Sequence, residues 1–521
     1  MTRTPTPQQQ TCIAAAVDES ISLVKIEACA GAGKTSTLGM MAEALPLPSL
    51  YLAFNKVTAN EAGEKFPKHV TCKTTHSVAY AAFGSKLARA GKLERPRGAY
   101  VNVAGTGSEV ARFFHIQPLV QAGEIILPAA FIGLLVKTTV ARFEQSADMS
   151  LNTTHTPYGE LMEKFKSVTF NVRDTQEMIL SHAKKLWHAR TDLDSEVLAT
   201  HDTYLKMFQL SKPVLTGFDV LYVDEFQDTT PCVLDIVMNQ QQHMKIVMVG
   251  DARQAIYGWR GAVNAMKMVD APTRVLSKSF RYGQAVADIA TTVLEGAMRI
   301  TGNEKIDSVV GFTDKVDRTK PYTRLFRTNS ALLSAAIAEI QHGTKVSIEI
   351  DVRDFVKLLQ SAVALKNEDK KNIKHDKILP YVEWNELVEE STHDAELSRI
   401  AKVIANGQAD EWIATLEKHK NAVDPHVTFT TAHKSKGREF SQVIVEGDFK
   451  SAYNENGEFV GLSEEEQNLL YVACTRAINV LEYNQTVVEY IRAGRVRPDF
   501  DEAVNESISG LKKDVQKAIA A

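Results

Sequence analysis

The chain has 521 residues, of which 44% are hydrophobic and 24% charged, and its formal net charge is -4. This length and composition predict a soluble, globular protein with several cores and more than one domain. The slight negative charge argues against a protein that coats nucleic acid by bulk attraction, so any such binding must come from a local groove.

No segment indicates a membrane or secretory role. The apolar stretch at 125–136 is broken by Pro128 and Gly133 and is too short to span a bilayer. The N-terminal residues contain no apolar signal-peptide core, so we expect a cytoplasmic protein, nucleoid-associated in a bacterium or in the host cytoplasm for a virus. The odd number of cysteines, without metal-ligand spacing, indicates reduced thiols: Cys12, Cys29, Cys72, Cys232 and Cys474.

Apolar runs that end in functional turns recur along the chain. The runs at 22–30, 218–228 and 245–251 have the composition of buried parallel strands, and 427–448 contains another pair of them. Helical stretches separate these runs. The pattern predicts an α/β protein with doubly wound parallel sheets.

Two stretches have few strand signals and read as mostly helical insertions. Amphipathic periodicity marks 129–143 and 174–189 within the first insertion, 84–205, and the second insertion, 334–425, is smaller and rich in charge. A basic run in the first insertion is either a nucleic-acid patch or a solvated helix face, and comprises Lys86, Arg89, Lys92, Arg95 and Arg97.

Residues 28–35 form a phosphate-binding loop between a predicted strand and a predicted helix. Its small residues would let backbone N–H groups approach the phosphates, and they are Ala30, Gly31, Ala32 and Gly33. Lys34 would reach the β- and γ-phosphate oxygens, and the Thr35 hydroxyl would ligate magnesium. The strict pattern has glycine where Ala28 stands. We therefore expect ATP and Mg²⁺ as cofactors.

Asp224 and Glu225 end the apolar strand VLYV. Asp224 would hold the magnesium shell and Glu225 would deprotonate the attacking water; the alternative is two acids that cap a strand end. Hydrolysis of the γ-phosphate also needs positive charge, for which Arg281 and Arg476 are the candidates. Taken singly, either arginine could form a surface salt bridge.

With these residues in place, the chain resembles the UvrD/Rep/PcrA type of superfamily 1 helicases in the order and spacing of its motifs. The most specific motifs are DEFQDT at 224–229 and GDARQAIYGWRGA at 250–262. The others, in family order, are TPQQ at 6–9, the phosphate loop, AFNKVTANEA at 53–62, TTHS at 74–77, SFR at 279–281, LFRTN at 325–329, TAHKSKGREF at 431–440 and EEEQNLLYVACTRA at 464–477.

The resemblance implies two RecA-like P-loop motor domains with ATP between them, each with a mostly helical insertion. The first motor domain would comprise 1–83 and 206–268, and the second 269–333 and 426–500. A helical tail would follow at 501–521.

The resemblance also implies roles at the nucleotide. Gln9 would read the adenine, Phe280 would stack on it, and Glu439 would contact the ribose. Gln254 would sense the γ-phosphate, and Arg281 and Arg476 would be the two arginine fingers. Ser36 would also contact the nucleotide, at a position where the family often has arginine.

For nucleic acid, the resemblance implies that Tyr257 and Trp259 stack on bases beside Arg260, which suits a sequence-tolerant motor. Trp259 taken alone could be a core aromatic. Further track residues would be His76 and His433, although a lone histidine more often makes structural hydrogen bonds. Phe54 and Asn55 would also contact the strand, and they lie in a motif whose aromatic falls one place later than in the family.

The stretch 54–80 resembles the F-box helicase branch most closely, yet the chain starts at the glutamine motif, so we expect neither an F-box nor that branch's regulation. The second insertion is short for a UvrD relative, and only a small subdomain fits there. About forty-five residues follow the last motif, which is too few for an added nuclease domain.

These features predict an ATP-dependent DNA helicase, and the resemblance implies 3′-to-5′ movement on single-stranded DNA. Its substrates would be single-stranded DNA and tailed duplexes, and the protein would act as a monomer. The alternatives are a translocase that strips bound proteins with little unwinding, and a non-hydrolysing scaffold. RNA remains a possible track, because only a 2′-OH contact distinguishes the sugars. Replication, repair and recombination are all open as pathways.

Overall fold

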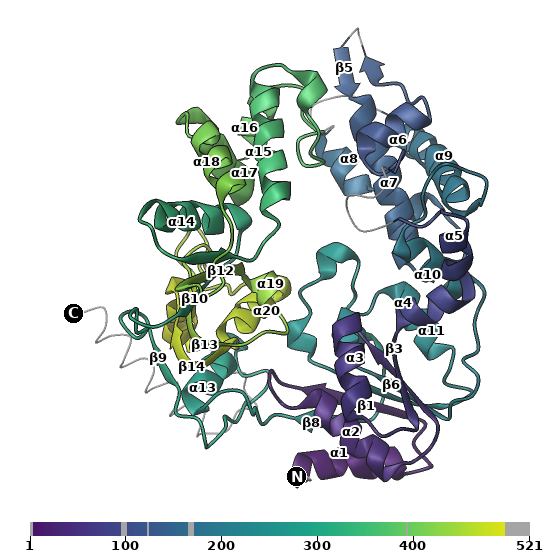
Figure 1. The fold of residues 1–521 in the computed structure, drawn as a ribbon, viewed down its shortest axis with the longest axis vertical. Coiled ribbons are helices and arrows are strands. Elements are labelled where there is room, and N and C mark those ends of the chain that lie inside the picture. The colour runs from purple at the N-terminus through teal and green to yellow at the C-terminus, as the bar shows by residue number, and fades with distance from the viewer. Residues whose placement is uncertain (1–3, 95–101, 122–123, 165–170, 392–393, 495–521) are drawn as a thin grey trace.

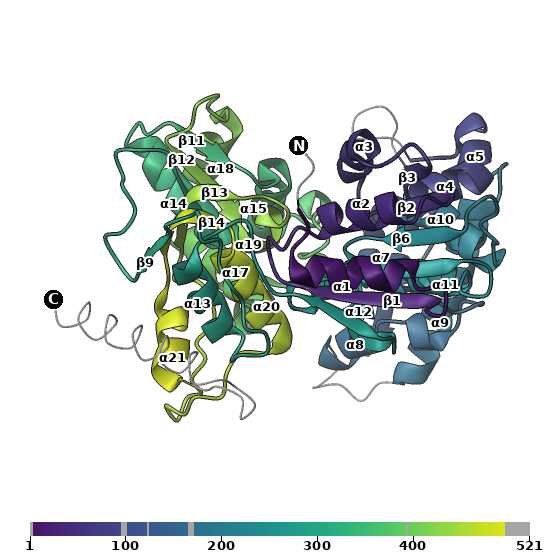
Figure 2. The same ribbon diagram turned by 90° about the horizontal axis from the view of Figure 1, so that it is seen from below.

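The computed structural model describes residues 4–94, 102–121, 124–164, 171–391 and 394–494. Two six-stranded parallel sheets lie side by side, each flanked by helices, with a mostly helical arm above each (Figures 1 and 2). This arrangement confirms the predicted α/β class with two RecA-like domains. The expected tail at 501–521 lies outside the described residues.

The first sheet has the strand order β3-β2-β6-β7-β1-β8, and all its neighbouring strands are parallel. Its strands are β1 (Leu23–Ala28), β2 (Ser49–Ala53), β3 (Val70–Thr74), β6 (Val220–Val223), β7 (Lys245–Gly250) and β8 (Thr273–Leu276). Its helices and helical turns are α1 (Pro7–Val17), α2 (Lys34–Ala44), α3 (Lys56–Lys65), α4 (Thr75–Ala79), η1 (Tyr80–Gly84), α5 (Ser85–Arg89), α10 (His201–Leu210), η3 (Phe226–Asp228), α11 (Pro231–Met238), η4 (Ala252–Gln254), η5 (Gly258–Arg260) and α12 (Ala265–Met268). The central strands carry apolar side chains on both faces because helices cover both.

The second sheet has the order β11-β12-β10-β13-β14-β9, also parallel throughout. Its strands are β9 (Val309–Gly311), β10 (Tyr322–Phe326), β11 (Val346–Ile348), β12 (Val427–Thr431), β13 (Phe440–Val445) and β14 (Ala477–Glu482). Its helices are α13 (Gln284–Val293), α14 (Asn329–Gln341), α19 (Ala432–Ser435), α20 (Glu464–Cys474) and α21 (Gln485–Ala493).

Several of the expected domain boundaries are wrong. The first insertion is shorter than 84–205, because α5 and the start of α10 pack with the first sheet. We placed 269–276 in the second motor domain, but β8 pairs with β1 and completes the first sheet. We also placed β11 in the second insertion, but it pairs with β12 at the edge of the second sheet. Both strands are short and only weakly apolar in sequence. Their pairing within a sheet therefore has to show which domain each belongs to.

The first arm packs α7 (Ala129–Gln145) against α6 (Gly107–Phe113) and α9 (Val172–Thr191) around its own apolar core. A Cβ added at Gly133 would lie 2.1 Å from the backbone oxygen of Gly107, so the two helices touch through their glycines. The arm also contains a two-stranded antiparallel sheet, β4 (Leu119–Gln121) and β5 (Glu124–Leu127), with η2 (Thr153–His155) and α8 (Tyr158–Lys164).

The second arm comprises α15 (Val352–Lys366), η6 (Lys370–Asn372), α16 (Trp384–Glu390), α17 (Ala395–Ala405) and α18 (Ala409–Lys418). Its apolar core is continuous with α14 and one face of the second sheet. The two arms meet at an ion pair, with Lys137 Nζ 3.2 Å from Asp376 Oδ2.

The basic run that begins at Lys86 does not act as one patch. Lys92 is only 3% exposed, and its ammonium group donates to backbone oxygens of Ala189, Ser195 and Val197. Arg95 and Arg97 lie outside the described residues. Lys92 therefore stabilises the base of the first arm. Among the described residues, no helix is long and apolar enough to cross a membrane.

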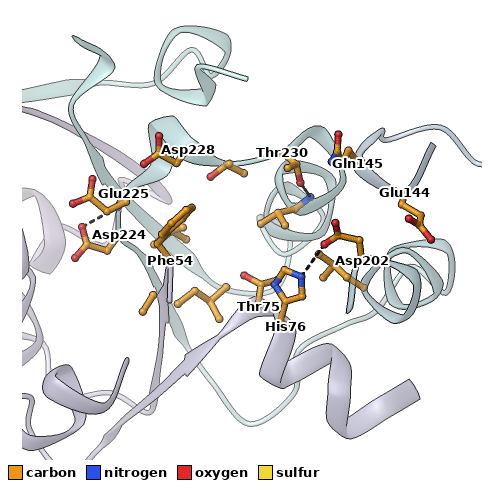
Figure 3. Close-up of a pocket in the computed structure, with 16 residues that line it drawn as sticks. Phe54, Thr75, His76, Glu144, Gln145, Asp202, Asp224, Glu225, Asp228 and Thr230 are labelled. Carbon is orange, nitrogen blue, oxygen red and sulfur yellow. Dashed lines mark hydrogen bonds and ion pairs between the residues drawn. The ribbon is translucent and has the colours of Figure 1, made fainter. Parts of the chain in front are cut away.

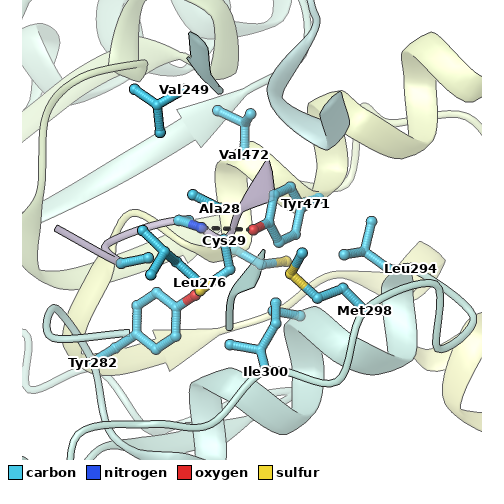
Figure 4. Close-up of a cluster of buried hydrophobic side chains, with 14 of the residues drawn as sticks. Ala28, Cys29, Val249, Leu276, Tyr282, Leu294, Met298, Ile300, Tyr471 and Val472 are labelled. Atoms are coloured by element: carbon cyan, nitrogen blue, oxygen red, sulfur yellow. Dashed lines mark hydrogen bonds between the residues drawn. The ribbon is translucent and has the colours of Figure 1, made fainter. Parts of the chain in front are cut away.

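One apolar core joins the two motor domains. Tyr282, Met298 and Tyr471 from the second half of the chain surround Ala28 and Cys29 at the end of β1, together with Leu276 of β8 (Figure 4). The Tyr471 hydroxyl also accepts a hydrogen bond of 2.9 Å from the Ala30 backbone N–H. The start of the phosphate loop is thus packed between both domains.

Candidate nucleotide and nucleic-acid site

The phosphate loop connects β1 to α2, where the sequence analysis placed it. Gly31 and Gly33 both adopt left-handed backbone conformations, with φ of 77° and 75°. A Cβ at Gly31 would lie 2.6 Å from Ser279 Oγ and 2.7 Å from Arg281 Cβ. Glycine is needed at position 31 because the SFR segment crosses directly over the loop.

The catalytic candidates of the first motor domain meet beside this loop. Lys34 Nζ lies 3.1 Å from Glu225 Oε1, and Thr35 Oγ1 donates to Asp224 Oδ2 over 2.9 Å. Tyr51 also donates to Asp224 Oδ2, over 2.7 Å. Glu225 has a left-handed backbone, with φ of 52°, an unusual conformation for a residue other than glycine.

Burial and charge set the protonation of this cluster. Burial alone would raise the pKa of Glu225, but the charges of Lys34 and Lys436 lower it to about 2. Burial and the charge on Glu225 raise the pKa of Asp224. Burial opposes the charge on Lys34, yet Glu225 and Asp224 raise its pKa. Lys34 and Glu225 therefore stay ionised at neutral pH.

The Thr35 hydroxyl and the Asp224 carboxylate supply two adjacent hard oxygen donors, which suits Mg²⁺. No group of three or more metal-binding side chains occurs within the part of the chain that the structure describes. A small donor set agrees with Mg²⁺, which binds one or two protein oxygens and takes its remaining ligands from water and substrate phosphates.

Gln254 and Arg476 face each other across the junction of the motor domains. Gln254 donates to Asp251 Oδ2 over 2.7 Å, and Arg476 Nη2 lies 3.5 Å from Gln254 Oε1. Arg476 is 1% exposed. Burial, with repulsion from Arg281, lowers its pKa to about 9. Tyr471 donates to Asp251 as well, so motifs from both domains share one buried hydrogen-bond network.

The remaining nucleotide candidates lie at the mouth of the loop. The Phe280 ring lies over Gly33, 3.5 Å from the position of an added Cβ, and its backbone N–H donates to Gly31 O over 2.8 Å. Arg281 Nε lies 2.9 Å from Glu439 Oε2. Gln9 is buried and donates to Thr37.

Two further loop candidates differ in exposure. Ser36 is exposed on the first turn of α2, while Ala32 is buried. The structure brings the predicted nucleotide residues to one place.

The predicted nucleic-acid residues cluster on the adjoining face. The Phe54 and Tyr257 rings stack in parallel, with centroids 5.9 Å apart and planes 4° apart. Trp259 is 68% exposed, and its ring meets the edge of His433 at 6.5 Å. The Arg260 guanidinium lies 5.5 Å from the Trp259 ring centroid. The exposure of Trp259 contradicts its alternative reading as a core aromatic.

A pocket lies between the two carboxylates, Asp224 and Glu225, and the base of the first arm (Figure 3). Asp224 and Glu225 line one end and Phe54 lies in the middle. At the far end His76 Nε2 lies 3.1 Å from Asp202 Oδ1, a residue of α10. Outside the pocket, the Asn55 side chain caps α3 by accepting from Thr58 N–H, so it has a structural role.

Sequence reasoning missed the residue that links the two faces. Lys436 donates to Asp228 Oδ2 over 2.5 Å and to the Gln254 backbone oxygen, and its Nζ lies 4.9 Å from the Tyr257 ring centroid. Burial raises the pKa of Asp228 to about 6, against the lowering effect of Lys436. Lys436 lies inside the quoted TAHKSKGREF motif, and that position was the available signal. Tyr51, in an ordinary apolar strand, offered none.

Two parallel sheets, a phosphate loop and a carboxylate pair beside that loop define a P-loop protein with two RecA-like domains. The chain belongs to the UvrD/REP helicase family, because the model of the UvrD/REP helicase N-terminal domain matches residues 6–270. This confirms the resemblance seen in the motifs.

Individual relatives agree with the family assignment. F-box DNA helicase 1 of Gallus gallus is 31% identical over 509 residues, which cover 89% of this chain and 47% of the relative. F-box DNA helicase protein 1 of Schizosaccharomyces pombe is 28% identical over 525 residues, covering 91% and 57%. ATP-dependent DNA helicase PcrA of Leuconostoc citreum is 36% identical over 114 residues, covering 20% and 15%. The chain spans about half the length of the two F-box relatives.

Proposed function

We propose that the protein is an ATP-dependent DNA helicase that moves along single-stranded DNA, with 3′-to-5′ polarity. The observation that carries the proposal is the position of Lys436. This one side chain contacts Asp228 and Gln254 on the nucleotide side and Tyr257 on the nucleic-acid side. A movement of Lys436 with the second motor domain would therefore act on both sites at once.

In the proposed reaction Glu225 accepts the proton of the attacking water, for which its low pKa keeps it ionised. Lys34, Arg281 and Arg476 stabilise the charge that develops on the transferred phosphoryl group. Thr35 and Asp224 would hold Mg²⁺, which when bound neutralises phosphate charge. Because Arg476 follows α20 of the second motor domain, full charge stabilisation requires closure of the domains.

Each closure would change how the strand is held. Trp259 and the Phe54–Tyr257 pair supply aromatic faces that grip any base, while His433 approaches Trp259 from the second motor domain. As the motor domains close and reopen, these side chains hold and release the bases in turn, and the protein moves stepwise along the strand. The names of the relatives favour DNA over RNA as the track, and the proposed 3′-to-5′ direction rests on the motif resemblance alone. We propose that the protein acts as a monomer, on tailed duplexes as well as single strands.

The first experiment compares ATP hydrolysis with and without single-stranded DNA, for the native protein and for Lys34→Ala. The same preparations are tested on duplexes with a 3′ or a 5′ tail. DNA-stimulated hydrolysis that Lys34→Ala abolishes, with unwinding from the 3′ tail alone, is the expected result. Unwinding from the 5′ tail would contradict the polarity. Stimulation without unwinding would indicate a protein-stripping translocase, and no hydrolysis would indicate a scaffold.

A further inference from the structure

A cavity of about 370 Å³ lies between the two motor domains. It is bounded by η4 and α12 of the first domain and by the end of α13 and the first turns of α20 of the second. One lining residue, Leu294, also belongs to the apolar core that joins the two domains (Figure 4). Within the part of the chain that the structure describes, no predicted site residue lines this cavity. The cavity therefore lies in a joint that has to move when the domains close.

Arg253 bridges the two domains at the wall of this cavity. Its Nη1 donates to Glu27 Oε1 over 2.7 Å, and Glu27 belongs to β1, the strand that leads into the phosphate loop. Its Nη2 donates to the backbone oxygen of Ala297, beyond α13, over 3.1 Å. A guanidinium group can make both bonds because its N–H donors form a rigid fork. One side chain thus connects β1 to the second motor domain.

The same ion pair fixes the turn η4, which carries Gln254. Glu27 Oε1 also accepts a hydrogen bond of 3.0 Å from the Ala252 N–H, at the start of the turn. Asn264 donates to the backbone oxygen of Ala252 over 2.8 Å. Gln254 follows Arg253 directly in the chain. A movement of the second domain that displaces the Arg253 side chain would therefore reach Gln254 through one residue.

The contacts of Arg253 differ from an ordinary surface ion pair. Burial, with repulsion from Asp251, raises the pKa of Glu27, and the charge of Arg253 counteracts this shift. Lys267, another cation of the lining, pairs with Glu464 of α20 over 2.6 Å, but both of these side chains are more than half exposed. Exposed pairs of this kind contribute little to stability. Loss of Arg253, in contrast, would leave a largely buried carboxylate without its cation.

We propose that Arg253 is a positioning residue for Gln254, and that it makes the position of Gln254 depend on the approach of the second motor domain. With the domains together, the bonds to Glu27 and to the Ala297 backbone hold η4 in place. As the domains separate, the bond to Ala297 is lost and the turn loosens. The inference rests on the proposed function and on the role of γ-phosphate sensor that the motif resemblance implies for Gln254.

The test measures kcat and KM for ATP hydrolysis with saturating poly(dT), for the native protein, Arg253→Lys and Arg253→Ala. Lysine keeps the charge beside Glu27, but its compact ammonium group cannot reproduce the fork that also reaches Ala297. We expect kcat to fall roughly 10- to 100-fold in both variants, as for a misplaced group in an active site. KM for ATP should change by less than about twofold, because an interaction that acts only on the transition state lowers kcat and kcat/KM equally.

A double variant tests whether Arg253 acts through Gln254. Residues that act as a unit have non-additive effects. In a Gln254→Ala background, the further substitution Arg253→Ala should therefore lower kcat by less than about threefold. A second loss as large as that in the native background would overturn the proposal, because Arg253 would then act by another route.

The matched control is Lys267→Ala, which removes another cross-domain contact of the same cavity and should leave kcat near the native value. An equal fall of kcat in Lys267→Ala would overturn the specific role of Arg253. Native kcat in Arg253→Lys would also overturn it, because the bond to Ala297 would then be dispensable. Thermal unfolding reports whether Arg253→Ala folds; if it does not, Arg253→Lys decides. Native protein without DNA-stimulated hydrolysis would refute the proposed function itself, whereas an active native protein with unaffected variants would refute this inference alone.

Discussion

Lys34 Nζ lies 3.1 Å from Glu225 Oε1, so the lysine that would contact the phosphates neutralises the carboxylate that would activate water. Both side chains are partly buried, and each favours the charged form of the other. Binding of a phosphate by Lys34 would weaken this pair and free Glu225 for the water. The Lys34–Glu225 ion pair is thus expected in the site before a phosphate binds.

Glu225→Gln should keep ATP binding and lose hydrolysis. Glutamine retains the size and one acceptor oxygen of the side chain but cannot take a proton, so we expect a fall of roughly 10²- to 10⁴-fold in the rate. Steady-state phosphate release, with fluorescent-nucleotide binding in parallel, measures both quantities. Loss of binding together with hydrolysis would mean that Glu225 mainly stabilises Lys34.

Arg476→Lys should reduce hydrolysis nearly as much as Arg476→Ala. The guanidinium makes directed contacts with Gln254, Val472 and Arg438 that a single ammonium cannot reproduce. Removal of an arginine finger costs about 10³-fold in rate or more. Near-native ATPase activity in Arg476→Lys would show that charge alone suffices at this position.

Trp259→Ala should weaken single-stranded DNA binding by about 1–3 kcal/mol, or roughly 5- to 150-fold, because one stacking surface is lost. Hydrolysis without DNA should be unchanged, since the exposed ring makes no contact with the phosphate loop residues. Fluorescence anisotropy with a labelled oligonucleotide provides the measurement. Tyr158→Ala, an exposed aromatic of the first arm, is the matched control; equal losses in both variants would argue against a specific stack.

We expect His433 to make the free energy of unfolding depend on pH between about 4 and 6.5. Burial, with repulsion from Arg327, lowers its pKa to about 4. In this pH range the imidazole of His433 binds a proton in the unfolded chain and not in the folded chain. The free energy of unfolding is therefore fully maintained above pH 6.5 and decreases as the pH falls toward 4. His433→Gln removes this loss. The destabilisation caused by the substitution should therefore be smaller at pH 4.5 than at pH 7, as judged by thermal unfolding. A difference that does not vary with pH would place His433 in solvent.

Gly133→Ala should destabilise the first arm, because the new methyl group would collide with the Gly107 backbone oxygen. Overpacking of this kind costs about 1–3 kcal/mol. Gly159→Ala is the control, since a Cβ there meets nothing within 4 Å, and in a helix it should be neutral or slightly stabilising. Thermal unfolding compares them. Equal effects in the two variants would contradict the close helix contact.

The fold class and the grouping of the nucleotide residues could be predicted from the sequence. Each of these residues lies in a motif with one chemical task. Lys34, Asp224 and Glu225 follow strands whose apolar runs identify them, so their meeting could be anticipated. The edge strands β8 and β11 could not be assigned, because only pairing across the chain defines them.

The roles of Lys436 and Lys92 could not be anticipated either. A lysine that pairs with a carboxylate of the other domain and a lysine buried among carbonyl oxygens look alike in a sequence. What distinguishes them is the set of neighbours that the fold supplies. Contacts of this kind join residues 97 to 208 positions apart, so local patterns do not contain them.

The position at which β8 ends limits how far Arg281, the proposed arginine finger, can move. The chain leaves the first sheet at Leu276, where the Gln8 side chain bonds to both the hydroxyl and the backbone N–H of Ser277. Arg281 follows Leu276 by only five residues, and five extended residues span at most about 18 Å. A short segment therefore joins Arg281 to the first motor domain. This segment limits how far Arg281 can move from the phosphate loop, even when the rest of the second domain moves.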